Sequence, residues 1–146
     1  MERESRFTKL LRFKRWFYTH KLKGIARGLD LIYRIVFGCD IPSSVPLGRG
    51  TLFEHCGLGC VVHPWSKIGE NCRIASHTTI GCRNKVGPPV LGDDVSVEFG
   101  ACVLGKIVIG NHVKISANAV VLHDVPDHCA VSGIPGKIQK CQLPTA

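Results

Sequence analysis

The sequence predicts a mainly β protein, a parallel β-helix of hexapeptide repeats, with a short helical segment at its N-terminus. Aliphatic residues return every six positions through most of residues 68–121, and glycine often follows them. Basic and aromatic side chains instead cluster at helical spacing near the start of the chain. The pattern changes from helical spacing to short β-type units near Cys39. We therefore expect a helical segment at 1–38, a β-helix domain at 39–133 and a C-terminal tail at 134–146.

Length and composition limit the class of protein. The chain has 146 residues, of which 45% are hydrophobic and 21% charged, as expected for one globular domain with a small appendage. No apolar run is long enough to span a bilayer, and the first residues lack the apolar segment of a secretory signal. We therefore expect a cytoplasmic protein, with the inner face of the membrane as a second location.

The N-terminal segment carries most of the excess positive charge. Residues 1–37 hold ten Lys and Arg against three acids, whereas residues 38–146 hold nine against eight. One helix is predicted from an aromatic and aliphatic set at helical spacing, and a more buried one at 29–37; the first set is Phe7, Leu10, Leu11, Phe13, Trp16 and Phe17. Two interpretations stay open: peripheral membrane association through residues 1–27, or packing on its own or a neighbouring subunit. No nucleic-acid module accompanies the charge, so no nucleic-acid partner is expected.

The six-residue repeat predicts the coil. Each unit is one short strand plus one corner, and three units close a triangular coil of eighteen residues. Stacked coils bury the aliphatic positions as a continuous core. These positions are Ile68, Ile74, Ile80, Leu91, Val97, Val103, Ile109, Ile115 and Val121.

The repeat breaks in three places. The step from Ile80 to Leu91 is eleven residues, which predicts a protruding loop after Gly81. Extra residues also occur within 53–62, and residues 123–128 lead away to a terminal strand and tail. The regular units mainly form the packed core, so we expect the functional residues at these departures.

Cysteine and histidine do not form a recognisable metal pattern. The eight cysteines contain no CxxC pair, and without a sign of export we expect reduced structural thiols. His123 and His128 are five positions apart, but Pro126 lies between them at the end of the repeats. The sequence therefore predicts no metal site.

Several motifs resemble the left-handed β-helix acyltransferases, particularly serine acetyltransferase. They are the Gly48-Arg49-Gly50 turn, the Glu54-His55 pair, residues 120–126 and residues 133–137, within a similarity that covers about 39–140. The resemblance implies a left-handed coil, contrary to the usual crossover rule, and a homotrimer with acetyl-CoA between subunits. It also implies that His55 is the general base and that Asp40, fifteen residues earlier, is its partner.

The chemistry of acetyl transfer requires such a pair. A hydroxyl is a poor nucleophile until a base removes its proton, and imidazole suits that task near neutral pH. A carboxylate on the other ring nitrogen fixes the tautomer and stabilises the imidazolium. For either residue alone, a structural role at a corner or turn is the alternative.

The resemblance also implies residues for the two substrates. Glu54, His77 and Arg83 are the candidates for the acceptor, which is either L-serine or a sugar hydroxyl of a surface polysaccharide or its precursor. In serine acetyltransferases the residue before the histidine is Asp and a longer loop supplies an Arg-His pair; here Glu54 and a shorter loop replace them. The short helical leader and Val61-Val62-His63-Pro64 look more like the related acetyltransferases of surface-polysaccharide assembly. For acetyl-CoA the candidates are Cys82, Phe99, Gly100, Ala117 and Lys137. A non-catalytic β-helix that serves as a scaffold or binding protein is the alternative function.

Overall fold

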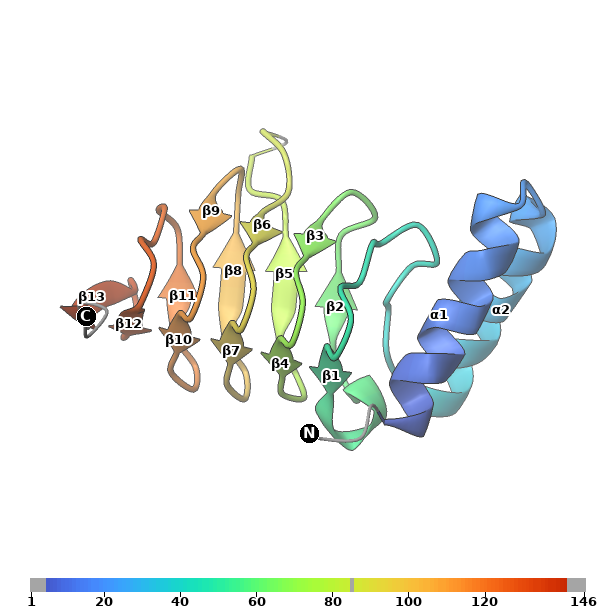
Figure 1. Ribbon diagram of the computed structural model, residues 1–146, viewed down its shortest axis with the longest axis horizontal. Helices are drawn as coiled ribbons and strands as arrows, with labels where there is room; N and C mark the ends of the chain where they lie inside the picture. The colour runs from blue at the N-terminus through green and yellow to red at the C-terminus, as the bar shows by residue number, and fades with distance from the viewer. Residues whose placement is uncertain (1–4, 85, 142–146) are drawn as a thin grey trace.

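The computed structural model describes residues 5–84 and 86–141, which form a helical hairpin followed by a long triangular coil (Figure 1). Helix α1 spans Arg6–Thr19 and α2 spans Lys23–Phe37. The Ser5 hydroxyl caps α1 by accepting a hydrogen bond from the Thr8 amide at 3.1 Å. Helix α2 ends at Gly38, whose φ of 63° is the left-handed conformation common at helix ends.

The coil consists of short strands that form three sheets. The first sheet has the order β1-β4-β7-β10-β12-β13, the second β11-β8-β5-β2 and the third β3-β6-β9, and all pairs are parallel except β12 with β13. The strands are β1 Leu52–Phe53, β2 Val61–Val62, β3 Lys67–Ile68, β4 Arg73–Ile74, β5 Thr79–Gly81, β6 Val90–Leu91, β7 Ser96–Val97, β8 Cys102–Leu104, β9 Val108–Ile109, β10 Lys114–Ile115, β11 Val120–Val121, β12 Cys129–Ser132 and β13 Lys137–Cys141.

The strand register confirms that the repeated aliphatic residues form the core. In the second sheet Val62 pairs with Ile80, Ile80 with Val103, and Val103 with Val121, and all four side chains are buried. Each of the three sheets contributes one such column, so the coil has a continuous apolar interior. A parallel three-sheet β-helix is therefore confirmed, while its left hand stays a prediction from resemblance.

The departures from the repeat also lie where the sequence predicted them. Ile80 pairs with Val103, twenty-three residues later, and the five residues beyond a regular coil form the loop after Gly81. Phe53 pairs with Ile74, twenty-one residues later, and the surplus forms a tight turn at Glu54–Gly57. The predicted tail differs from expectation, because Lys137–Cys141 is a strand that folds back on β12.

The helical hairpin closes one end of the coil through apolar and ionic contacts. Phe7, Leu11 and Tyr33 belong to the same buried cluster as the coil interior. Lys14 is 1% exposed and its ammonium group donates to Asp30 Oδ1 at 2.8 Å and to the Ile41 carbonyl. The hairpin thus packs on its own subunit, which is one of the two interpretations of this segment.

Candidate active site

Four successive corners of the coil stack into one edge, which we call the His55 edge: residues 54–60, 75–78, 98–101 and 116–119 (the lower loops in Figure 1). Backbone hydrogen bonds link each corner to the next. The His77 amide donates to Leu58 O at 2.8 Å, Gly100 N to Ser76 O at 3.2 Å and Asn118 N to Phe99 O at 2.9 Å. Side chains from different coils are therefore brought side by side along this edge.

His55 lies at the first and most irregular of these corners. Its φ is 47° and that of Cys56 is 55°, so two consecutive non-glycine residues adopt the left-handed conformation. Such residues each cost of the order of 1 kcal/mol, and they are concentrated at functional sites. The turn leaves the imidazole exposed, with its ring centre 6.0 Å from that of Phe99.

A cavity of about 430 Å³ adjoins this turn. Its walls come from Arg6 and Phe7 of α1, from Leu52 of β1 and from Glu54, His55 and Cys56. Because the start of α1 forms one wall, the hairpin contributes directly to the shape of the candidate site.

Glu54 holds a carboxylate at the edge of the same cavity. Its Oε1 accepts a hydrogen bond from Arg73 Nε at 2.6 Å, and Arg73 Nη1 also contacts Glu98 Oε1 at 3.4 Å. The other oxygen, Oε2, is buried and accepts no hydrogen bond from the described residues. A buried acceptor without a donor is unusual in a folded protein.

Asp40 lies on the coil that precedes the end of the His55 corner. In the described chain its carboxylate forms no hydrogen bond with the His55 imidazole. Its backbone joins the second sheet, accepting from Val62 N and donating to Cys60 O, both at 2.8 Å. Its carboxylate accepts from Arg34 Nη2 at 2.8 Å, and this hydrogen bond raises the pKa of Arg34.

The next corners carry four of the other predicted residues. His77 packs over Gly59, where an added Cβ would lie 2.5 Å from the imidazole Cδ2. Phe99 and Ala117 are exposed on consecutive corners. Gly100 has a φ of 70°, and a Cβ there would lie 2.3 Å from Asn118 Oδ1. Glycine is therefore required at this position for steric and conformational reasons.

The chain is similar to known transferases over most of its length. Residues 88–123 match the family model for the bacterial transferase hexapeptide (six repeats). The serine acetyltransferase of Synechococcus elongatus is 38% identical over 130 residues, covering 87% of this chain and 53% of that protein. The chain belongs to the hexapeptide-repeat transferases of the serine acetyltransferase family.

Solved structures of serine acetyltransferases superimpose closely on the chain. The Neisseria gonorrhoeae enzyme in complex with serine has a TM-score of 0.85 and 32% identity, covering 92% of this chain and 55% of that one. A serine acetyltransferase in complex with CoA has a TM-score of 0.83 and 29% identity, covering 91% and 55%. The chain spans about half the length of the serine acetyltransferases that it matches.

Three residues that the serine acetyltransferase resemblance suggested lie away from the His55 edge. Cys82 and Arg83 follow β5 in the protruding loop, which belongs to a different corner of the coil. Arg83 lines a cavity of about 340 Å³ together with Leu104 and Lys106. Lys137 starts β13 and lines another cavity, of about 290 Å³, beside His123. Within one chain, these residues and His55 do not form one site.

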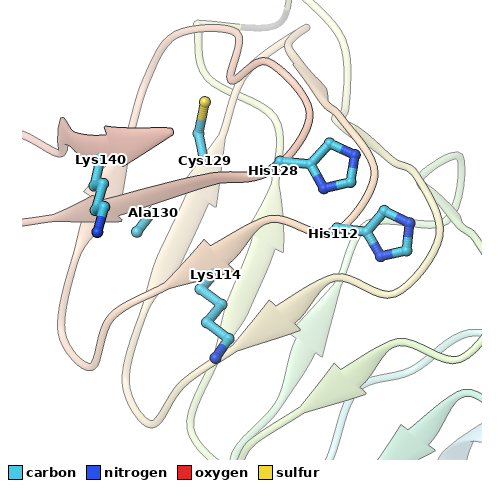
Figure 2. A pocket seen from close by; sticks show the side chains of 6 residues that line it. All are labelled: His112, Lys114, His128, Cys129, Ala130 and Lys140. Carbon is cyan, nitrogen blue, oxygen red and sulfur yellow. The ribbon is translucent and has the colours of Figure 1, made fainter. Parts of the chain in front are cut away.

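The histidines that suggested a metal pattern also separate. His128 stacks on His112, with ring centres 4.7 Å apart, at the third edge of the coil. Both line a cavity of about 110 Å³ with Lys114 and Lys140 (Figure 2), whereas His123 lies elsewhere. No group of three or more His, Cys, Asp or Glu in the described chain has a geometry suited to a metal ion.

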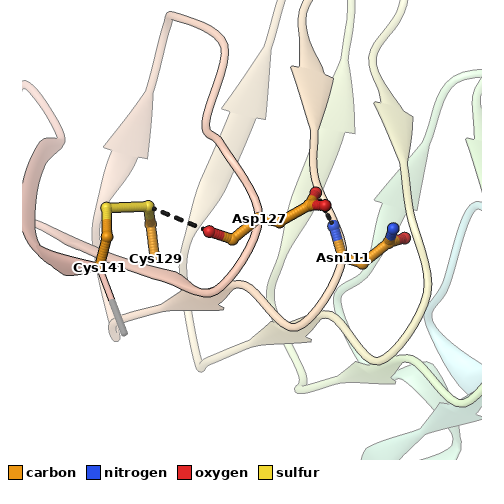
Figure 3. The surroundings of a disulfide bond; sticks show 4 residues. All are labelled: Asn111, Asp127, Cys129 and Cys141. Carbon is orange, nitrogen blue, oxygen red and sulfur yellow. Dashed lines mark hydrogen bonds between the residues drawn. A yellow bond between two sulfur atoms is a disulfide. The ribbon is translucent and has the colours of Figure 1, made fainter. Parts of the chain in front are cut away.

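The cysteines differ from expectation at one pair. Cys129 of β12 and Cys141 of β13 form a disulfide (Figure 3), because the antiparallel register places them directly opposite each other. The expectation of reduced thiols throughout is therefore wrong for these two residues. Burial raises the pKa of the Cys39 and Cys60 thiols, and that of Cys72 to about 11, which keeps them protonated.

Two arginines at the site were missed in the sequence. Arg73 of β4, the strand one coil after β1, forms ion pairs with Glu54 and Glu98. Arg34, near the end of α2, forms an ion pair with Asp40. Arg73 follows Glu54 by nineteen residues. This separation is close to one coil, so the sequence could have indicated that the two side chains lie on neighbouring coils. Nothing in the repeat indicates Arg34, because it lies outside the coil.

Proposed function

We propose that the chain is an acetyl-CoA-dependent O-acetyltransferase in which His55 is the general base. The observation that supports this role is the exposed imidazole on the left-handed turn, beside the cavity of about 430 Å³. The relatives are serine acetyltransferases over the same coil. The proposal extends their activity to this chain, which covers about half of their length.

The proposed reaction needs only one base. The neutral imidazole of His55 accepts the proton of the acceptor hydroxyl while the hydroxyl oxygen attacks the thioester carbonyl of acetyl-CoA. The tetrahedral intermediate then expels the CoA sulfur, which takes the proton back from the imidazolium. The acceptor becomes an acetyl ester and the free thiol of CoA leaves, so protons and electrons balance. A backbone N–H at Cys82 is proposed to stabilise the developing oxyanion.

Asp40 is proposed as the residue that orients His55. In this role the carboxylate accepts a hydrogen bond from the imidazole N–H that faces away from the acceptor. Its present partner, Arg34, lies at the surface and the pair is largely exposed, so exchange of partners costs little free energy. Arg34 thereby holds Asp40 close to the edge until the catalytic arrangement forms.

The acceptor is proposed to bind between Glu54 and His77, with L-serine as the first candidate. The carboxylate of Glu54 lines the cavity of about 430 Å³ and its charge suits the ammonium group of an amino acid, and the Neisseria gonorrhoeae relative is solved with serine. A sugar hydroxyl is the second candidate, because Glu54 is longer than the family's Asp and the loop after Gly81 lacks the family's Arg-His pair.

Acetyl-CoA is proposed to lie along the His55 edge, against Phe99, Gly100 and Ala117. The exposed ring of Phe99 and the small residues beside it leave the backbone of these corners accessible. Cys82, Arg83 and Lys137 come from other parts of the surface, so they can contribute only from a neighbouring copy. We propose a homotrimer with its sites between subunits, as the resemblance to serine acetyltransferases implies.

A comparison of acceptors tests the proposal. Release of the CoA thiol from acetyl-CoA is measured with L-serine and with simple sugars, against the hydrolysis rate without acceptor. Turnover with either class supports the transferase, and its absence with every hydroxyl acceptor favours the scaffold alternative.

Glu54→Gln separates the two acceptors, with Glu70→Gln at another corner as the matched control. If Glu54 holds an ammonium group, the KM for serine rises about tenfold or more. The reaction with a sugar would change much less, because a sugar has no ammonium group for the carboxylate to bind. An unchanged KM for serine contradicts the assignment of Glu54.

A further inference from the structure

The helical hairpin has an apolar face that no described part of the chain covers. Arg12 and Arg15 of α1 donate to the carbonyls of Gly48 and Ser44, which shows which flank of the hairpin faces the coil. Helical periodicity places a set of large apolar side chains on the other flanks. We call this set the outer face: Leu10, Phe13 and Trp16 of α1, and Ile25, Ile32, Ile35 and Val36 of α2, which are 43–75% exposed.

The two helices present this surface together. Figure 1 shows them side by side at one end of the coil, with no further element of the described chain beyond them. On α2, Asp30 and Arg34 bond toward the coil, and Ile25, Ile32 and Val36 lie on the opposite flank. A contiguous apolar patch of this kind marks an interaction surface rather than ordinary exposure.

Residues 5–37, which include the outer face, carry an excess of positive charge. Arg6, Lys9, Lys21 and Arg27 are exposed and form no ion pair with the described residues. Asp30 is the single acid among residues 5–37. Its carboxylate is already bound to Lys14 and to the Ser43 hydroxyl, at 2.6 Å from the latter. The partner of this face is therefore expected to be anionic.

A second feature lies where the hairpin turns. A cavity of about 300 Å³ separates this turn from the coil, and its lining includes Tyr18, Lys23, Arg27 and Trp65. Trp65 is 76% exposed and its ring lies 5.6 Å from that of His63. This cavity lies on the coil-facing flank of the hairpin, so it is separate from the outer face.

We propose that the outer face docks on an anionic phospholipid surface, with its apolar side chains at the headgroup boundary and with Arg6 and Lys9, which share the flank of Phe13 on α1, at the lipid phosphates. Two such faces from separate copies would bring like charges together, which disfavours a second copy as the occupant. Neither helix of the described chain has the length and apolarity needed to cross a bilayer, so the hairpin would lie on the surface.

The structure alters the surface that the sequence predicted for this contact. The sequence suggested residues 1–27, with the basic side chains of the first helix as the contact. Arg12, Lys14 and Arg15 instead bond within the chain, and the apolar surface extends along α2 to Val36. The docking surface thus includes the part of α2 that the sequence assigned to a buried helix.

Vesicle flotation tests the proposal without substrate, so its outcome is independent of acetyl transfer. The full chain should bind vesicles of phosphatidylcholine with phosphatidylserine, and binding should fall with added salt. Ile35→Asp should reduce the partition coefficient about tenfold or more. The matched control is Ile134→Asp, because Ile134 is 74% exposed and Ile35 is 75% exposed.

Charge variants test the proposed headgroup contacts. Arg6→Gln with Lys9→Gln should weaken binding about fivefold for each charge removed, whereas Lys67→Gln with Lys114→Gln should not. Circular dichroism checks that each variant is folded. Equal binding to vesicles of phosphatidylcholine alone, or no binding to either, would overturn the proposal. A lower oligomer mass in Ile35→Asp without a change in vesicle binding would also overturn it, by assigning the face to a second copy.

Discussion

Lys14 provides a quantitative test of how the helical hairpin is held to the coil. Its ammonium group is buried, bonds to Asp30 and Ile41 O, and lies 4.8 Å from the centre of the Tyr33 ring. Lys14→Met keeps most of the apolar stem but leaves Asp30 without its cation. Removing one partner of a buried ion pair costs about 3–5 kcal/mol. Asp30 keeps two donors from Ser43 and is 24% exposed, so we expect the lower end, about 3 kcal/mol.

The loss should be confined to the hairpin, because each unit of a solenoid is stabilised mainly by its neighbours. Hydrogen exchange of the α1 amides should accelerate by about two orders of magnitude for 3 kcal/mol, while exchange in β7–β10 changes little. Lys67→Met, at an exposed position of β3, is the control and should change stability by less than about 0.5 kcal/mol.

Adding Asp30→Asn to Lys14→Met should recover at least about 1 kcal/mol, because no unpaired charge then stays buried. A loss below about 1 kcal/mol in the single variant, or equal acceleration of exchange throughout the coil, would refute this account of the hairpin.

Three further predictions concern the coil and the site. Gly100→Ala should destabilise the protein by at least about 1 kcal/mol and weaken acetyl-CoA binding, whereas Gly28→Ala, with open space around it, should stabilise it by about 0.5–1 kcal/mol; thermal unfolding and binding titrations measure both. Burial raises the pKa of Cys72 to about 11, so its contribution to stability is complete below the ordinary thiol pKa and is lost as the pH rises through 11; urea unfolding against pH should show this loss, and Cys72→Ala should remove it. Asp40→Asn should lower kcat about 100-fold or more, while Arg34→Gln should keep kcat and change stability little, because the ion pair is exposed; the reverse order in steady-state kinetics would contradict the role of Asp40.

The regular part of the fold could be predicted from the sequence, because burial in the coil requires an apolar residue at every sixth position. Val62, Ile80, Val103 and Val121 pair in one column, and each is buried because its strand position points into the apolar interior of the coil. The irregular turn at Glu54–Gly57 and the loop after Gly81 were predictable for the same reason, as interruptions of that period.

The contacts between distant side chains could not be predicted in this way. Arg34 reaches Asp40 from the end of a helix, and its direction depends on how the hairpin docks. The Cys129–Cys141 disulfide depends on β13 folding back against β12, which no six-residue pattern specifies. The division of the chain into segments 1–38, 39–133 and 134–146 and the roles of the site residues stay predictions.

The central claim is that His55 removes the proton from the acceptor, and His55→Ala tests it most directly. The assay is CoA release from acetyl-CoA with the preferred acceptor, with His112→Gln, on another edge, as the control. We predict a fall in kcat of about 10²–10⁴-fold with acetyl-CoA binding preserved, and no change in the control. Turnover by His55→Ala at the wild-type rate would contradict the mechanism.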